Sequence, residues 1–235
     1  MKNAETLEQH RRRGHERLYP SLTNPNWLVL RKRREIFHRW LQRLPPGEFD
    51  VLDVGGRLQP YRPLLEGRLR KYTAIDLFSS PLVDIVGRGE QLPLRDRQFD
   101  LVFCTQVLEY SPDPRLVIAE VHRVLKPGGS LFLSSPAALP RTADEECWRF
   151  LPAGLRQLLA EFGEVEVLPE GGSVTGFFRT INVCMNMFVR YPAVRSIFQR
   201  TLCPVINLTG AVLETLSGER NDQFAVNYSA RARKE

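Results

Sequence analysis

Two short apolar segments of this sequence carry the residues best suited to hold a ligand. The first, residues 49–54, is followed by Gly55 and Gly56, and the second, residues 72–77, contains Asp76. A glycine turn after a buried strand lets backbone N–H groups approach an anionic or polar ligand closely. A carboxylate at the end of the next strand can accept both hydroxyls of a ribose. Together the two segments indicate a site for a nucleoside-bearing cofactor.

The elements that position these residues alternate between strand and helix patterns. Strands are predicted at residues 49–54, 72–77, 81–86, 98–104, 130–136 and 164–168, and helices at 114–125 and 155–163. Residues 61–65 could open another helix, although the prolines there make an irregular start. Alternation of this kind predicts a parallel sheet with right-handed crossovers.

Further site candidates follow from this sheet, because ligands bind at the carboxyl ends of its strands. Thr105 and Gln106 follow the strand at residues 98–104. The turn at residues 87–90 follows the strand at 81–86, and its backbone amides, with Arg88 or Glu90, could contact the edge of a nucleoside base.

The first 48 residues are predicted to form two helices, over residues 3–18 and 26–44. The second helix has an apolar face that should pack on the sheet or cover the cofactor cleft. The formal net charge is +6. Two basic clusters, residues 11–13 and 31–34, supply much of the excess. A solvated helical face is the favoured interpretation, and attraction to a phosphate-bearing substrate or an anionic surface is the alternative.

Composition narrows the class of protein. A chain of 235 residues with 43% hydrophobic content is long enough for one α/β domain with a substantial core. The four cysteines are scattered, so neither a disulfide framework nor a metal site is expected, and a reducing cytoplasm fits. The polar start predicts no signal peptide, and no apolar run approaches the roughly 20 residues that span a bilayer. Nucleic-acid binding is not expected, because no motif supports it.

Six segments in order and spacing resemble the class I S-adenosylmethionine-dependent methyltransferases. They are Val51–Gly55, Ala74–Asp76, Gly89–Pro93, Phe99–Val102, Val107–Glu109 and Arg123–Gly129. The resemblance implies S-adenosylmethionine as cofactor and a Rossmann-like sheet of seven strands, mostly parallel, with an antiparallel last strand at residues 224–230. It divides the chain into an N-terminal helical extension, residues 1–48, and a methyltransferase domain, residues 49–235.

The cofactor-binding residues that the resemblance implies lie in the turns of this frame. They are Asp53, Gly55, Gly56, Arg57, Asp76, Leu77, Arg88, Gly89, Glu90, Thr105 and Gln106. Arg57 stands where the family usually has glycine, and Arg88 where it often has aspartate. Arg57 could pair with the cofactor's carboxylate, or it could obstruct the pocket and leave a non-catalytic binding or scaffold subunit. A nicotinamide dinucleotide is disfavoured, because its glycine motif would need glycines at Arg57 and Pro60.

Methyl transfer needs a base only if the acceptor must lose a proton. The catalytic candidates are Tyr110, Asp144, Glu145, Glu146 and Arg149. Tyr110 stands where the family often has histidine, so its role as a base is in question. Residues 144–150 resemble a segment of methyltransferases from polysaccharide and secondary-metabolite clusters, which implies O-methylation of a sugar or glycosylated natural product. A salt-bridged loop and helix cap is the structural alternative.

An insertion at residues 171–222 separates the last two strands. It is predicted to form one or two apolar helices that carry Arg179, Arg190, Arg195 and Arg200. A lid, a homodimer face and a peripheral membrane contact all fit such helices. Because the common frame accounts for the cofactor, this insertion is predicted to select a small-molecule or glycan acceptor through its arginines.

Overall fold

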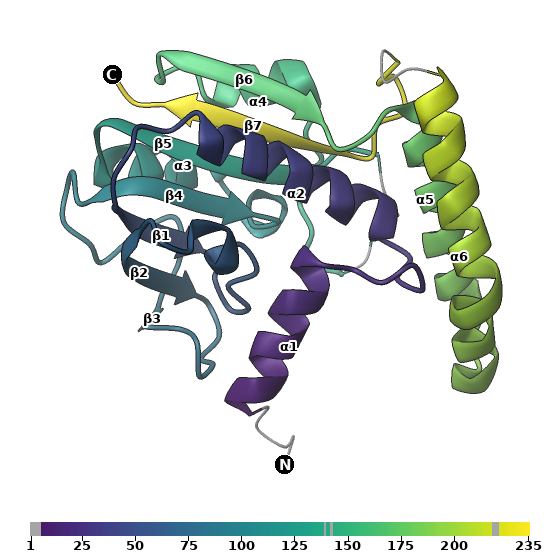
Figure 1. Cartoon of the computed structure of the whole chain (residues 1–235). Coiled ribbons are helices and arrows are strands. Elements are labelled where there is room, and N and C mark those ends of the chain that lie inside the picture. Colours follow the sequence, from purple (N-terminus) through teal and green to yellow (C-terminus); the bar gives the residue numbers. More distant parts are fainter. Residues whose placement is uncertain (1–5, 139, 142, 218–220) are drawn as a thin grey trace.

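The fold is one seven-stranded sheet with helices on both faces (Figure 1). The computed structural model describes residues 6–138, 140–141, 143–217 and 221–235. The strands are β1 Phe49–Val54, β2 Leu69–Asp76, β3 Ile85–Val86, β4 Phe99–Thr105, β5 Leu125–Pro136, β6 Glu164–Pro169 and β7 Asn227–Arg233. Their order is β3-β2-β1-β4-β5-β7-β6, and β7 is antiparallel to both of its neighbours. The predicted mostly parallel sheet with an antiparallel last strand is confirmed.

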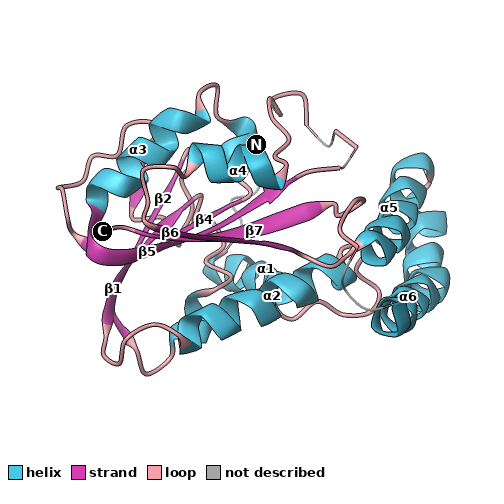
Figure 2. Cartoon of the chain, turned by 90° about the horizontal axis from the view of Figure 1, so that it is seen from above, coloured by secondary structure: helices cyan, strands magenta, loops and turns pink. Residues whose placement is uncertain are grey.

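The helices form two layers and a separate pair (Figure 2). They are α1 Leu7–Leu18, α2 Trp27–Gln42, α3 Pro114–Val124, α4 Pro152–Leu158, α5 Ser173–Phe188 and α6 Pro192–Ser217, with short 3-10 turns η1 Arg62–Leu65 and η2 Leu108–Tyr110. α3 and α4 cover one face of the sheet, and α1 and α2 lie on the other. α5 and α6 stand side by side beyond the carboxyl ends of the parallel strands.

An aromatic cluster joins α2 to the sheet. The Phe37 ring lies 5.6 Å from Phe132 and 5.8 Å from Phe103, and the Trp40 ring lies 5.3 Å from Phe132. All four side chains are buried. The apolar face predicted for this helix therefore packs on the sheet, and α2 supplies part of the main core. The division of the chain at residue 48 stays a prediction.

Apolar side chains on the opposite face complete the core. Leu52, Val102 and Leu131 from three neighbouring strands pack with Val117 and Val121 of α3. The central strands are buried on both faces because helices cover both, which is why their sequences are almost continuously apolar. No helix in the described ranges is long and apolar enough to cross a membrane.

Some predicted boundaries are wrong. The helix proposed at residues 61–65 is only the 3-10 turn η1, in which Pro63 lies near the start. α4 begins at Pro152, three residues before the predicted start, and β3 is limited to Ile85–Val86. β7 begins three residues later than predicted, because the Asp222 carbonyl accepts a hydrogen bond from Ala225 N and extends the preceding turn.

The two basic clusters have different environments. Arg12 is exposed and pairs with Glu16, as expected for a solvated face. In the second cluster Arg33 is buried, so that interpretation is wrong for this residue. Its Nε and Nη2 each lie 2.8 Å from a carboxylate oxygen of Glu170, the residue after β6. This ion pair connects α2 to the far edge of the sheet.

Candidate functional site

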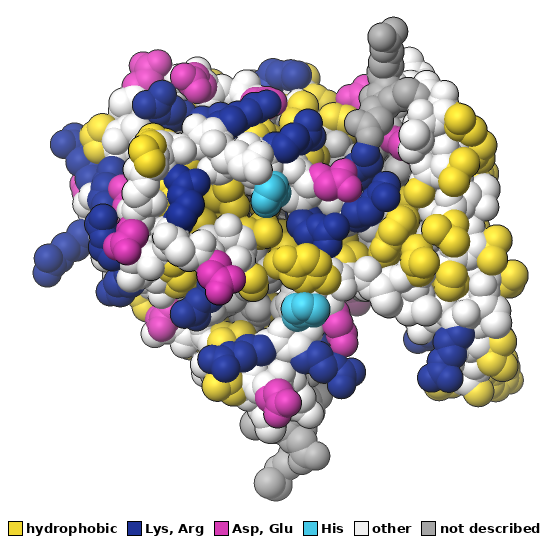
Figure 3. Space-filling view, in the orientation of Figure 1, with side chains coloured by type: hydrophobic (Ala, Val, Ile, Leu, Met, Phe, Trp, Pro, Cys, Tyr) yellow, Lys and Arg dark blue, Asp and Glu magenta, His cyan; other side chains and the backbone are white. Residues whose placement is uncertain are grey.

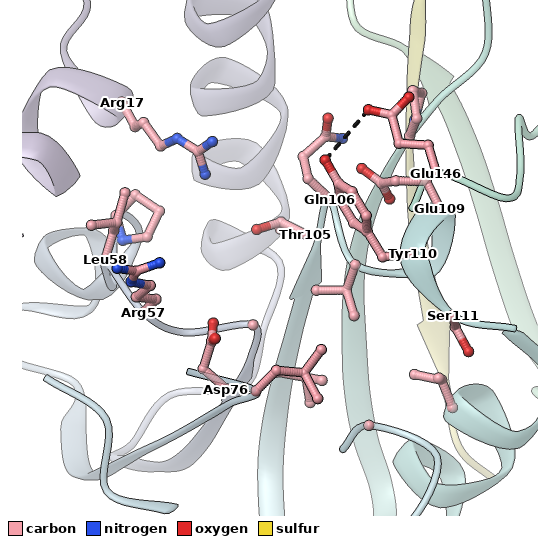
Figure 4. Close-up of a pocket in the computed structure, with 18 of the residues that line it drawn as sticks. Arg17, Arg57, Leu58, Asp76, Thr105, Gln106, Glu109, Tyr110, Ser111 and Glu146 are labelled. Carbon is pink, nitrogen blue, oxygen red and sulfur yellow. Dashed lines mark hydrogen bonds between the residues drawn. The ribbon is translucent and has the colours of Figure 1, made fainter. Parts of the chain in front are cut away.

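A cavity of about 810 Å³ opens at the carboxyl ends of β1, β2 and β4. This volume is in the range of small-molecule sites. Thirteen of the predicted site residues line it: Gly55, Arg57, Asp76, Leu77, Arg88, Gly89, Glu90, Thr105, Gln106, Tyr110, Glu145, Glu146 and Arg149. Figure 4 shows Arg57 and Asp76 on one side of the cavity, with Glu109, Tyr110 and Glu146 on the other. The sheet thus brings segments far apart in sequence to one site.

The turn after β1 requires glycine at position 55. Gly55 has a φ of 77°, and a Cβ there would lie 2.4 Å from Cγ2 of Val107. The amides of Gly55 and Gly56 donate to the Ile75 carbonyl at 2.8 and 3.1 Å. These two amides are therefore held within the fold, and the expectation that they face the ligand is wrong for them. Gly55 instead lets the backbone come close to the cavity.

Asp53 and Gly56, both predicted to bind cofactor, lie behind the cavity wall. Asp53 is 1% exposed, and its Oδ2 accepts a hydrogen bond from the Tyr72 hydroxyl at 2.7 Å. Burial raises the pKa of Asp53 to about 7, although the Tyr72 hydrogen bond acts in the opposite direction. A Cβ on Gly56 would lie 2.9 Å from the Asp53 side chain. Asp53 therefore supports the turn from beneath.

Asp76, at the end of β2, places its carboxylate in the cavity. Oδ1 accepts a hydrogen bond from Phe78 N at 2.9 Å, which fixes the side chain beside the turn. The Arg57 guanidinium lies over the Phe78 ring, 5.8 Å from its centroid. No carboxylate of the described residues forms a salt bridge with Arg57. The site therefore offers a carboxylate and an available guanidinium on the same side (Figure 4).

The turn after β3 is fixed by polar contacts. Glu90 accepts a hydrogen bond from the Ser111 hydroxyl at 2.7 Å, and Arg88 Nε lies 3.6 Å from its other oxygen. Gly89 lies against Val54 and Val117, where a Cβ would meet their methyl groups at 3.4 and 3.3 Å. Arg88, Gly89 and Glu90 of this turn line the same cavity as Asp76.

Gln106, directly after β4, has an unusual backbone conformation. Its φ is 56°, which is uncommon for a residue other than glycine and is frequent at functional sites. Its amide donates to the Ser134 carbonyl at 2.8 Å, and its Nε2 donates to the Ser134 hydroxyl at 3.2 Å. In the amide orientation that satisfies its neighbours, Asn227 accepts hydrogen bonds from both Gln106 and Arg33. A buried network thus holds the end of β4 in place.

Glu109, which was not among the predicted site residues, also lines the cavity. Its side chain is 2% exposed, and Oε2 has no hydrogen-bond partner among the described residues. Its carbonyl accepts hydrogen bonds from Cys147 N and Trp148 N at 2.6 and 3.3 Å. Burial raises the pKa of the Glu109 carboxyl to about 7. The only sequence signal for Glu109 as a site residue was its place in the Val107–Glu109 segment. The burial of its carboxyl depends on distant parts of the chain, so the sequence did not show it.

The segment at residues 144–150 folds over η2. Tyr110 donates from its hydroxyl to Glu146 Oε1 at 3.4 Å (Figure 4). Arg149 forms a salt bridge with the same carboxylate. The segment is therefore salt-bridged and also lines the cavity, so the two alternatives for it are compatible. Asp144 does not line the cavity and pairs with Arg141 at 3.1 Å.

Arg179 of α5 brings the insertion to the cavity wall. Its Nε and Nη2 donate to Asn26 Oδ1 at 3.0 and 2.7 Å, whereas Nη1 is buried with no partner in the described ranges. Burial lowers the pKa of Arg179 to about 10, and the nearby Arg33 acts in the same direction. Arg190 is exposed and does not line the cavity.

Known proteins are similar to this chain in the segments that form the cavity. A family model described as a methyltransferase domain matches residues 52–133, which hold the turn after β1, the end of β2 and η2. The chain is 37% identical over 92 residues to malonyl-[acyl-carrier protein] O-methyltransferase 1 of Coxiella burnetii, covering 36% of this chain and 33% of that protein. It is 55% identical over 47 residues to a ubiquinone biosynthesis O-methyltransferase of Pseudomonas paraeruginosa, covering 20% of this chain and 19% of that protein.

A solved S-adenosylmethionine-dependent methyltransferase from Archaeoglobus fulgidus shares the fold, with a TM-score of 0.52 at 16% identity over 86% of this chain and 94% of that one. The chain belongs to the class I S-adenosylmethionine-dependent methyltransferases. It spans a third or less of the length of these two sequence relatives.

The site residues of this class I methyltransferase fit its family's methyl donor, S-adenosylmethionine. The Asp76 carboxylate suits a ribose diol, and the Arg57 guanidinium suits a carboxylate. Within the described ranges, no group of three or more histidine, cysteine, aspartate or glutamate side chains could hold a metal ion.

Other lining residues were not among the predicted site residues, although Arg13 and Arg33 belong to the two basic clusters noted in the sequence. They include Arg13, Arg17, Asn26, Arg33, Phe78, Ser111 and Asn227. α1 supplies the first two, and the next two are the residue before α2 and a residue of α2. Their contribution depends on how these helices fold back over the sheet, which no local pattern shows.

Proposed function

We propose that this methyltransferase transfers a methyl group from S-adenosylmethionine to an oxygen atom of a small acceptor that carries an anionic group. One observation supports this most strongly. A single cavity contains Asp76 on one side and the buried, unpartnered carboxyl of Glu109 on the other. The first group suits the cofactor's ribose, and the second is available to an acceptor.

The side of the cavity that contains Asp76 is assigned to the cofactor from the chemistry of its side chains. Asp76 accepts hydrogen bonds from the ribose hydroxyls, and Arg57 binds the cofactor's carboxylate. Glu90, Arg88 and the backbone between them contact the edge of the base. Asp53 and Gly56 act indirectly, because they shape the turn without lining the cavity.

The bound sulfonium supplies an already activated methyl group. The protein must then align the acceptor with it and exclude water. The acceptor half is closed by residues 145–149 and by η2, which the Glu109 carbonyl holds together. Tyr110 and Arg149 both contact Glu146, so the wall beside the acceptor is fixed before it binds.

Glu109 is the proposed proton acceptor for the acceptor hydroxyl. A general base works best when its pKa lies near the working pH, and burial raises the pKa of Glu109 to about 7. Its Oε2 has no partner in the described part of the chain, so it can accept the hydroxyl proton without first breaking a hydrogen bond. Tyr110, by contrast, donates to Glu146, which makes it a positioning residue in this proposal.

The anionic group is proposed to bind Arg179. Its Nη1 is buried and unpartnered in the residues described, and Arg17 lines the same cavity. The names of the two relatives, both O-methyltransferases, support oxygen as the methylated atom. The sugar or glycosylated acceptor expected from the sequence stays a prediction.

The proposal is tested by acceptor-dependent formation of S-adenosylhomocysteine. Methyl-labelled S-adenosylmethionine is incubated with the protein and a set of hydroxyl and carboxyl compounds, with and without an anionic group. We expect label on an oxygen of an anionic acceptor, with loss of turnover but not of cofactor binding in Glu109→Gln. Label on nitrogen or carbon, or turnover independent of Glu109, would contradict the proposal.

A further inference from the structure

α5 and α6 form a closed antiparallel hairpin (Figure 1). Asn182 donates to Asn207 Oδ1 at 2.9 Å between the two helices, and both side chains are buried. Glu214 of α6 accepts a hydrogen bond from Thr175 N at 2.8 Å, which caps the start of α5. The facing sides of the helices therefore hold the hairpin together, and Asn207 Nδ2 also donates to the Leu22 and Asn24 carbonyls. Their outer sides are not needed for that purpose.

The outer side of α6 carries an apolar stripe that is interrupted once, by the exposed Thr201. Its exposed members recur every three to four residues or at multiples of that spacing, as one helix face requires: Val194, Ile197, Val205, Leu208, Val212 and Leu216. Cys203, Asn207 and Glu214 are buried on the opposite face. Figure 3 shows hydrophobic side chains spread over this hairpin. The sheet leaves this face uncovered.

The free end of the hairpin combines aromatic and basic side chains. Phe188 is 76% exposed and Tyr191 is 75% exposed. Arg190 stands next to Tyr191 in the sequence, and Arg195 Nη2 donates to the Val189 carbonyl at 2.8 Å. Arg200 is exposed further along α6. Every charged residue from position 171 to 213 is arginine, with no aspartate or glutamate in that range. Apolar surface and positive charge therefore coincide at one end of the molecule.

We propose that this hairpin docks onto an anionic lipid bilayer. Such a bilayer offers an apolar layer beneath a negatively charged surface, which matches the exposed aromatics and the arginines at the free end. A second copy of the chain is a poorer match, because a twofold contact at this end would bring like charges together. The helices then lie at the bilayer surface, in the manner of interfacial amphipathic helices. This inference does not depend on the proposed methyl transfer.

Sedimentation with vesicles tests the proposal on the full chain. The vesicles contain phosphatidylcholine, with or without phosphatidylglycerol. We expect binding to be about tenfold stronger with phosphatidylglycerol and to weaken at high salt, because surface charge attraction is screened. Phe188→Ser combined with Ile197→Ser should lower the partition constant roughly tenfold or more, since two apolar side chains no longer leave water.

Charge and position are tested separately. Arg190→Glu combined with Arg200→Glu should lower binding to phosphatidylglycerol vesicles by about tenfold or more. Leu116→Ser combined with Arg156→Glu changes one exposed apolar residue of α3 and one exposed arginine of α4, away from the hairpin, and should leave binding unchanged. Thermal unfolding followed by circular dichroism shows whether each variant is folded.

Three results would overturn the proposal. One is absence of wild-type binding to phosphatidylglycerol vesicles. Another is equal loss of binding in the hairpin variants and in the α3 and α4 control. The third is a wild-type dimer in sedimentation velocity that Phe188→Ser with Ile197→Ser converts to a monomer, because the apolar face would then be an interface between copies.

Discussion

Arg179 of α5 and Asn26, the residue before α2, are joined by two hydrogen bonds to one oxygen. Nε and Nη2 of the guanidinium donate to Asn26 Oδ1 at 3.0 and 2.7 Å. The remaining nitrogen, Nη1, is buried and lacks a partner among the described residues. A buried charged donor without a partner is costly, so a ligand acceptor at this position would bind favourably. The contact therefore links the insertion to the wall of the cavity.

Arg179→Ala should raise the acceptor's KM about tenfold or more. A hydrogen bond to a charged group contributes about 1.5–3 kcal/mol, and this one is expected only with the acceptor. The Kd for S-adenosylmethionine should not change. Arg190→Ala is the matched control and should have no effect on either constant, because Arg190 is exposed outside the cavity. Equal effects of the two variants would remove the assigned role of Arg179.

Glu109→Gln should abolish the rising limb of the pH profile, that is, the increase of kcat/KM with pH. In the wild type the carboxyl must be ionised to accept a proton, so kcat/KM should increase as pH passes through about 7, the pKa that burial gives this group. Glutamine cannot ionise, so the remaining rate should be lower and should not show this limb. Glu145→Gln, an exposed cavity residue, should keep the limb. A wild-type limb that persists in Glu109→Gln would assign the base elsewhere.

The Arg33 and Glu170 ion pair should matter for stability. Removing one partner leaves a buried charge, so Arg33→Met should lower the free energy of unfolding by about 3–5 kcal/mol. Glu170 would then keep its hydrogen bond from Ser229 at 2.7 Å but lose its counter-charge. The double variant Arg33→Met with Glu170→Leu should recover part of the loss. Urea unfolding measures this, and additive losses would show that the two charges act independently.

Asp53→Asn should change how stability depends on pH. The folded-state pKa of Asp53 is raised to about 7 from its ordinary value of 3.8, so the folded state binds a proton more readily than the unfolded chain. The stability from this group is therefore complete below about pH 4 and is lost as pH rises to about 7. Asparagine removes that loss.

Glu109 also makes the free energy of unfolding fall as pH rises, because its pKa is raised as well. The effect of Asp53 is therefore isolated by comparing the unfolding free energies of the wild type and Asp53→Asn, at pH 5 and again at pH 8. We expect the variant to be relatively more stable at pH 8. A difference that does not vary with pH would mean that the pKa of Asp53 is not raised.

The general frame was predictable from the sequence because its signals are local. The run at residues 49–54, the carboxylate of Asp76 and the helix at residues 114–124 each depend on neighbours in the chain. The strand order then follows from the family resemblance and places Thr105 and Gln106 at the cavity as predicted.

The remaining features depend on contacts between distant segments. Arg33 and Glu170 are separated by 137 positions, and neither has a local pattern that indicates a buried pair. Glu109 is buried because Cys147 and Trp148 fold over its carbonyl. The sequence placed Asp53 at the ligand because the family motif includes it, but its hydrogen bond from Tyr72 directs it behind the turn.

Calorimetric titration with S-adenosylmethionine tests the central claim, that this cavity binds the methyl donor, most directly. We expect saturable one-site binding to the wild type. Asp76→Ala should weaken it by about 1.5–3 kcal/mol, because two charge-assisted hydrogen bonds to the ribose are lost. Asp144→Ala, an exposed carboxylate outside the cavity, should bind as the wild type does. Absence of binding to the wild type, or an Asp76→Ala affinity equal to that of the wild type, would contradict the account.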